Sequence, residues 1–174
     1  MAESKWPWFE RKFNFDFPLE KLRDIMERLR GTSLRLAPIA ELSGSIRTRR
    51  IQDTWSIQEN VGHLLELESL WLGRVEDILD GNAELREADL TNQATFDANY
   101  NETDFARLRE MFAEARERLL ERLGEIPAGM ATQTAAHPRL KVPMRIVDVA
   151  YFAAEHDDYH LARIMEIRRL ISDD

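Results

Sequence analysis

The chain has 174 residues, of which 24 are Lys or Arg and 32 are Asp or Glu, so its formal net charge at pH 7 is −8. This length suits one domain, expected across residues 1–174, and the acidic balance disfavours sequence-blind binding to nucleic acid or anionic membranes. The absence of cysteine excludes disulfides, a thiol nucleophile and Cys-ligated metals, and it fits a cytoplasmic protein.

Residues 1–16 form an aromatic-rich N-terminal arm in which bulky rings alternate with charged side chains. Its rings include Trp6, Trp8 and Phe9. The arm lacks the uninterrupted apolar run of a secretory signal, and no part of the chain approaches the roughly 20 apolar residues that span a bilayer. We expect the arm to pack on the protein or on a dimer partner.

Four segments carry the spacing of apolar side chains that is typical of amphipathic helices. The first covers residues 19–30 and is expected to end at Gly31, before a weaker stretch at 33–42 that Pro38 interrupts. The second begins at a capping box formed by Ser56 and Glu59 and continues to residue 80. The third is capped by Thr103 and covers 105–123, and the fourth covers 145–171.

The segments between these helices read as loops, and almost nothing resembles a strand. Residues 43–53 are polar, and residues 124–144 are rich in small residues and proline. The loop at 82–102 exceeds ordinary connections, so it is either a functional lid or contains a short helix. Four helices that each need to bury one face predict an all-α four-helix bundle with a long loop between helices two and three.

Two histidines on the last predicted helix carry the main chemical signal. His156 and His160 are four residues apart, so on a helix they share one face, which also carries Val149 and Phe152. Two imidazoles without partners in an apolar interior would be costly, whereas coordination of a shared metal ion would satisfy both.

A third histidine, His63, lies on the face of the second predicted helix that carries Leu67 and Leu70. Three inward histidines supply the neutral nitrogen ligands that Zn²⁺, Ni²⁺ or Fe²⁺ commonly uses, with a fourth position open to water. Spacing alone leaves an alternative open, because such histidines are often satisfied core residues that bind no metal. His137 precedes a proline and is expected to play a structural role in a loop.

Other catalytic signatures are absent from the sequence. It has no Gly-rich phosphate loop, no G-x-S-x-G elbow, no H-E-x-x-H pair and no dinucleotide-binding fingerprint. The carboxylates to test as a general base are Glu59, Glu66 and Asp157, but no catalytic residue can be assigned from the sequence.

Two segments resemble the DinB-like superfamily of metalloenzymes. Residues 55–63 (WSIQENVGH) resemble the WS-x-x-E-x-x-x-H start of that family's second helix. Residues 137–140 (HPRL) and 147–164 (VDVAYFAAEHDDYHLARI) resemble its closing motif, and the similarity spans residues 17–171. His63, His156 and His160 match the family's three metal-ligand positions. One departure is the KVP sequence at 141–143, near which the family often has a glycine.

The resemblance implies an up-down-down-up bundle that often forms homodimers. It also implies a divalent ion at the three histidines, often nickel or zinc, with iron as a further option. The better understood relatives are isomerases and S-transferases that use low-molecular-weight thiols such as mycothiol or bacillithiol.

Three functions follow as hypotheses. The first is a metal-dependent transferase that activates a low-molecular-weight thiol for attack on a small-molecule substrate. The second is a metal-dependent hydrolase that activates water at the same site. The third is a non-catalytic bundle that the metal stabilises.

Overall fold

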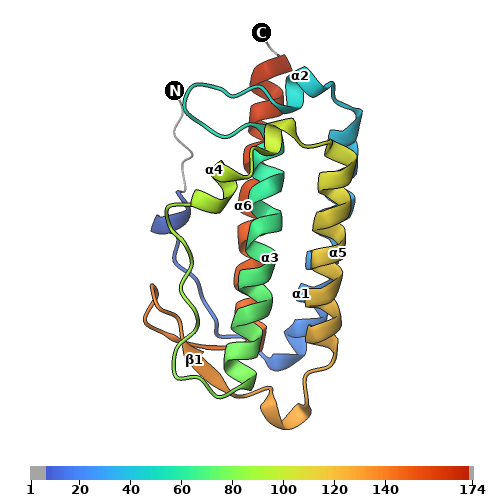
Figure 1. The fold of residues 1–174 in the computed structure, drawn as a ribbon. Helices are drawn as coiled ribbons and strands as arrows, with labels where there is room; N and C mark the ends of the chain where they lie inside the picture. Colours follow the sequence, from blue (N-terminus) through green and yellow to red (C-terminus); the bar gives the residue numbers. More distant parts are fainter. Residues whose placement is uncertain (1–6, 173–174) are drawn as a thin grey trace.

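The computed structural model of the protein describes residues 7–172 (Figure 1). Trp6 of the predicted arm and both ends of the expected 1–174 domain lie outside the described residues. The four long helices are α1 (Leu22–Arg35), α3 (Ile57–Leu79), α5 (Phe105–Gly124) and α6 (Ile146–Ser172). Within residues 7–172, no helix is both long and apolar enough to cross a membrane.

The four helices form the predicted up-down-down-up bundle. In Figure 1, α1 and α6 run upward while α3 and α5 run downward. Helix α3 packs against α5 and α6, and α1 packs against the same two helices on the other side. Because α3 and α5 are parallel, the chain must return along the length of the bundle between them, and residues 80–104 make this crossover.

Short elements connect the long helices. They are the 3-10 helices η1 (Trp8–Glu10), η2 (Leu19–Lys21), η3 (Ala37–Glu41), η4 (Tyr100–Glu102) and η5 (Ala128–Met130), the α-helices α2 (Gly44–Arg47) and α4 (Gln93–Asp97), and the strands β1 (Thr134–Ala136) and β2 (Pro143–Arg145). Helix α4 resolves the open question about the long loop, which does contain a short helix.

The boundaries of two predicted helices were wrong. Helix α1 does not end at Gly31 but continues to Arg35, because the buried side chains of Leu29 and Thr32 continue its inner face across the glycine. A single helical glycine costs only about 1 kcal/mol, which this burial outweighs. The cap of α5 is Asp104 rather than Thr103, since its carboxylate accepts a hydrogen bond from the backbone nitrogen of Arg107 at 2.9 Å.

The prediction of almost no strand structure is confirmed, since the sheet of residues 7–172 consists of two strands of three residues each. Strands β1 and β2 form an antiparallel hairpin in which Ala135 lies opposite Met144, and both side chains are buried. The crossover adds a third edge, because the backbone nitrogen of Leu85 donates to the carbonyl oxygen of Ala136 at 3.0 Å. Three-residue strands are too short to show a recognisable alternation in the sequence.

The start of α3 follows the predicted capping box. The backbone nitrogen of Glu59 donates to the Ser56 hydroxyl at 3.1 Å, and the Ser56 nitrogen donates to the Glu59 carboxylate at 2.8 Å. One turn later, Gly62 gives the crossover room to pack on the helix, because a side-chain carbon there would lie only 2.0 Å from the Tyr100 ring. The crossover is thereby held next to His63.

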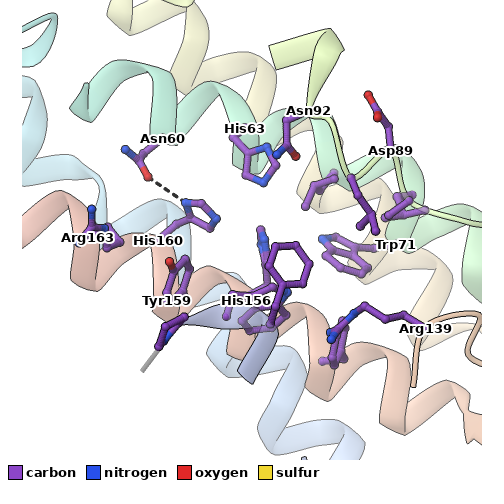
Figure 2. Close-up of a pocket in the computed structure, with 18 of the residues that line it drawn as sticks. Asn60, His63, Trp71, Asp89, Asn92, Arg139, His156, Tyr159, His160 and Arg163 are labelled. Carbon is purple, nitrogen blue, oxygen red and sulfur yellow. Dashed lines mark hydrogen bonds between the residues drawn. The ribbon is translucent and has the colours of Figure 1, made fainter. Parts of the chain in front are cut away.

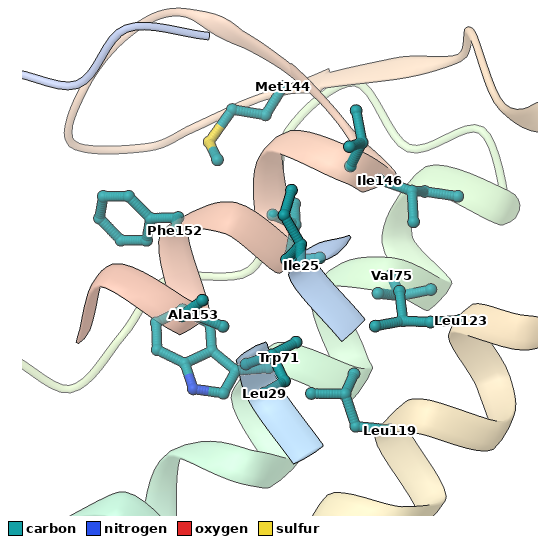
Figure 3. Close-up of a cluster of buried hydrophobic side chains, with 14 of the residues drawn as sticks. Ile25, Leu29, Trp71, Val75, Leu119, Leu123, Met144, Ile146, Phe152 and Ala153 are labelled. Atoms are coloured by element: carbon teal, nitrogen blue, oxygen red, sulfur yellow. The ribbon is translucent and has the colours of Figure 1, made fainter. Parts of the chain in front are cut away.

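Two apolar clusters fill the bundle, and a buried polar layer lies between them. Figure 3 shows the cluster nearer the hairpin, to which Leu29, Trp71, Leu119 and Phe152 contribute. The second cluster lies toward the other end of the bundle and is formed by Leu36, Ile39, Ile57, Val61, Leu64, Tyr100, Phe105, Leu108, Phe112, Ile164, Ile167 and Ile171.

Arg116 of α5 is the centre of the polar layer. Its guanidinium donates to Glu68 of α3 at 2.5 and 2.9 Å, to Asp157 of α6 at 2.6 Å, and to the carbonyl oxygen of Leu29 in α1 at 2.9 Å. The Thr32 hydroxyl donates to the same Asp157 carboxylate at 2.7 Å. All four helices therefore meet at one fully buried ion network.

The substitution Arg116→Ala should lower the free energy of unfolding by about 3 to 5 kcal/mol, because it leaves two buried carboxylates without their partner. The measurement is urea unfolding followed by circular dichroism. Arg107→Ala is the control, since Arg107 is exposed and its ion pair within residues 7–172 is with Glu110 on the surface, so the substitution should leave the urea midpoint nearly unchanged. Equal effects of the two substitutions would contradict this assignment.

Candidate metal centre

The structure brings the three predicted ligands together at the α3–α6 contact (Figure 2). Helix α3 supplies His63, and α6 supplies His156 and His160 from consecutive turns. One ring nitrogen of each lies within 4.8 Å of those of the other two, and all three side chains are buried. Three imidazole nitrogens at this spacing could hold a single metal ion.

Hydrogen bonds orient two of the three rings. The Nδ1 of His160 lies 2.8 Å from the side-chain oxygen of Asn60, whose amide nitrogen donates to the carbonyl oxygen of Ser56 at 2.8 Å. Because an amide oxygen only accepts, the proton of His160 is on Nδ1 and the lone pair is on Nε2. The Nδ1 of His63 lies 3.1 Å from the Thr95 hydroxyl in α4. Such partners are typical of histidines that ligate metals.

The third ring lacks a hydrogen-bond partner. The Nδ1 of His156 is buried and has no hydrogen-bond partner among the described residues. Leaving a buried polar atom unpaired carries a penalty of about 1 to 3 kcal/mol, which is why such atoms are rare. A metal ion bound through this nitrogen would give it a partner and remove that penalty. The three histidines therefore fit the metal ion that their pattern predicts.

The electrostatic setting keeps the three imidazoles neutral. Burial lowers the pKa of His63 to about 4. Burial, together with repulsion from neighbouring cationic groups and from the other imidazoles when charged, holds the pKa of His156 and of His160 well below the usual value. At neutral pH each ring therefore presents a lone pair rather than a second proton.

The three rings border a cavity of about 580 Å³ on the side of the bundle away from α1 and α5. The N-terminal residues, α4 with the rest of the crossover, and the hairpin cover this side of α3 and α6 (Figure 1). The apolar part of the lining consists of Pro7, Trp8, Phe9, Trp55, Leu67, Leu70, Trp71, Ala88, Leu90, Pro138, Phe152 and Ile167.

Indole rings surround the histidines. Trp55 lies 4.6 Å from the His63 ring, and Trp8 and Trp71 lie 4.9 and 5.7 Å from the His156 ring, measured between ring centroids. Trp71 is also a core residue, with 3% of its surface exposed. Rings at these distances limit the access of water to the site and lower the local dielectric constant.

His137 is in a loop, as the sequence predicted, and not in the three-histidine cluster. Its Nδ1 accepts hydrogen bonds from the backbone nitrogens of Arg139 and Leu140 at 3.1 and 3.2 Å, which shapes the turn between β1 and β2. This structural role does not remove it from the site, since its ring also lines the cavity. Lys141 closes the same turn with a positive φ of 55°, at the position where the sequence departs from the family pattern.

The candidate general bases are engaged elsewhere. Glu59 pairs with Arg50 and caps α3, Glu66 accepts a hydrogen bond from the Tyr100 hydroxyl, and Asp157 belongs to the Arg116 network. None of these carboxylates lines the cavity. The structure instead adds Asn60, Thr95 and three arginines of the cavity lining, Arg74, Arg139 and Arg163, none of which the sequence analysis identified.

A model of the DinB superfamily matches residues 19–164. The chain belongs to the DinB superfamily. Among solved structures, this DinB protein is similar to YfiT from Bacillus subtilis, described as a "probable metal-dependent hydrolase with an unusual four-helix bundle topology". The TM-score is 0.79 at 17% identity, over 93% of this chain and 94% of that one.

A protein from Streptococcus pneumoniae is also similar, with a TM-score of 0.62 at 11% identity, over 90% of this chain and 91% of that one. At these identities the likeness shows the fold alone. No curated protein matches the DinB chain.

The metal-free protein should lose stability as the pH falls from about 6.5 toward 4. In this range the histidines of the unfolded chain bind protons, whereas the buried histidines of the folded chain stay neutral. His63 alone should contribute on the order of 1 kcal/mol of this loss at about pH 5.5, given its folded pKa of about 4. Urea unfolding of chelator-treated protein measures it. The pH dependence should shrink in His63→Gln, and an unchanged slope would contradict the neutral assignment.

Proposed function

We propose that His63, His156 and His160 bind one divalent ion, nickel or zinc with iron as a further option, in a transferase that activates a low-molecular-weight thiol. The observation that carries the proposal is the buried Nδ1 of His156, which has no hydrogen-bond partner among residues 7–172 and lies beside two rings that are already oriented. A set of three neutral imidazoles without thiolate or carboxylate suits these borderline metals better than magnesium or calcium. When bound, such an ion supplies a Lewis acid that lowers the pKa of a thiol or of water.

The cavity supports a second small molecule as the source of the nucleophile. The chain has no cysteine, and the acidic residues of the lining are Glu87 and Asp89, both exposed. Asp89 accepts hydrogen bonds from Thr91 and Gln93, so its carboxylate is committed to its own loop. A volume of about 580 Å³ lies within the range of ligand sites and exceeds what a water molecule needs.

The residues around the histidines have separate tasks in this proposal. Asn60 and Thr95 hold the rings of His160 and His63, and the indoles of Trp8, Trp55 and Trp71 exclude water from the thiol and the electrophile. The family resemblance supports the thiol, and it also leads us to propose a homodimer. The absence of cysteine supports a cytoplasmic location.

A metal-dependent hydrolase is the second candidate. The observation that favours it is the similarity to YfiT, whose description names that activity, over nearly the whole of both chains. A non-catalytic metal-stabilised bundle is the third, and it predicts a large loss of melting temperature on chelation without any turnover.

Protein purified without a metal-affinity tag should contain close to one equivalent of nickel, zinc or iron by elemental mass spectrometry. His63→Ala, His156→Ala and His160→Ala should each lose most of it, because two imidazoles hold these ions far more weakly than three. His137→Ala is the matched control, a histidine of the same cavity outside the cluster, and should keep the metal. A wild-type protein that contains no metal and binds no added metal would contradict the proposed metal site.

The metal-loaded protein should conjugate chlorodinitrobenzene with at least one of bacillithiol, mycothiol, glutathione and coenzyme A, and His160→Ala should reduce the rate by about 100-fold or more. Absorbance of the conjugate gives the rate. Ester, amide and phosphate panels run without thiol test the hydrolase. Product formation that requires metal but no thiol would support the hydrolase. No product in either assay would support the non-catalytic bundle.

A further inference from the structure

The cavity holds a buried arginine that forms no ion pair with a carboxylate of the described residues. Arg74 lies on α3 three turns after His63, and only 2% of its surface is exposed. Its guanidinium donates to the carbonyl oxygen of Arg86 at 3.2 Å and lies 3.2 Å from the Nε2 of His137. It forms no ion pair with any residue of 7–172, and burial lowers its pKa to about 10. A buried cation normally has a partner.

A second arginine faces the same end of the cavity. Arg139 leaves the hairpin turn and extends inward (Figure 2), with its guanidinium carbon 5.2 Å from the Phe9 ring centroid. Its Nη2 is buried without a hydrogen-bond partner among the described residues. Burial lowers the pKa of Arg74 most, and the negative charge of Asp77 opposes this effect. The positive charge of Arg139 lowers the pKa of Arg74 further, because the two cations repel each other.

The nearby acidic groups do not pair with the two arginines. Asp77, the carboxylate that acts most on Arg74, forms an ion pair with the exposed Arg86 at 2.8 Å. Asp89 is bound within its own loop, and Glu87 lines the cavity from an exposed position without an ion pair to Arg74 or Arg139. The chain therefore gathers two guanidiniums beside the neutral ring of His137 and leaves the compensating negative charge to a ligand.

The distance to the histidines limits the size of that ligand. The centroid of the Trp71 ring lies 5.5 Å from the Arg74 guanidinium carbon and 5.7 Å from the His156 ring. The guanidinium carbon is therefore no more than about 11 Å from the His156 ring. Leu67, Leu70 and Phe152 add apolar surface to the same cavity. A molecule with a short apolar body and one anionic end fits between the two groups.

We propose that Arg74 and Arg139 form a carboxylate-binding subsite, and that the small-molecule substrate is an apolar organic acid whose carboxylate lies there while its other end reaches the three histidines. The planar, bidentate fork of arginine matches a carboxylate. The assignment of the reacting end rests on the proposed function, but binding of the carboxylate by the two arginines does not.

Isothermal titration calorimetry on the metal-loaded protein with phenylpropanoate, the neutral phenylpropanamide and inorganic phosphate tests the subsite. Phenylpropanoate should bind on the order of tenfold or more tighter than the amide, because charge-assisted hydrogen bonds form only with the acid. Arg74→Met and Arg139→Met should each remove most of this preference and leave amide binding unchanged. Arg107→Met, an exposed arginine of α5, should change neither.

Two further measurements separate the subsite from a structural role and from the metal. Arg139→Met should change the melting temperature little, since its Nη2 has no hydrogen-bond partner among residues 7–172 and its ring contact is with the exposed Phe9. The preference for the acid should persist in metal-free His160→Ala, so a failure of the metal proposal would not be read as a failure here. Equal affinity for acid and amide, an unchanged preference in both arginine variants, binding of phosphate alone, or no binding of any probe would each overturn the proposal.

Discussion

The alignment of the three histidines depends on one buried arginine. Arg116 forms ion pairs with both Glu68 of α3 and Asp157 of α6, and both pairs form only when these helices are set so that the two carboxylates reach the same guanidinium. Asp157 directly follows His156 in the chain, so the turn of α6 that serves the ion network also aims its neighbour at His63. The ion pairs in the centre of the bundle and the alignment of the three rings therefore require the same setting of α3 and α6.

The central layer and the cavity differ in how fully their buried polar groups are paired. Groups of the central layer hydrogen-bond to one another, as Asp157 does with Arg116 and Thr32. At the cavity, the Nδ1 of His156 and the Nη2 of Arg139 have no hydrogen-bond partner among residues 7–172. A folded chain tolerates such groups where a ligand completes them, and their presence on two sides of one apolar space is what distinguishes this cavity from a packing defect.

The sequence allowed prediction of what depends on local periodicity. The positions of His63, His156 and His160 on inward helix faces follow from apolar neighbours one turn away, and the capping box at Ser56 needs only four residues. Thr95, Arg74 and Arg139 could not be predicted in the same way. Thr95 reaches His63 only because the crossover packs on Gly62, and the two arginines meet only because the hairpin folds back over α3. The end of α1 was misplaced for a related reason, since tertiary burial outweighed the local preference of one glycine.

The hydrogen bond between Asn60 and His160 joins residues 100 positions apart in the chain. During synthesis, α3 with its single histidine leaves the ribosome long before α6 exists, so a nascent chain can offer a metal at most one ring of the set. The site becomes complete only when the final helix docks against α3, which also closes the bundle. In the proposed function, loading of the ion therefore has to follow the docking of α6 against α3.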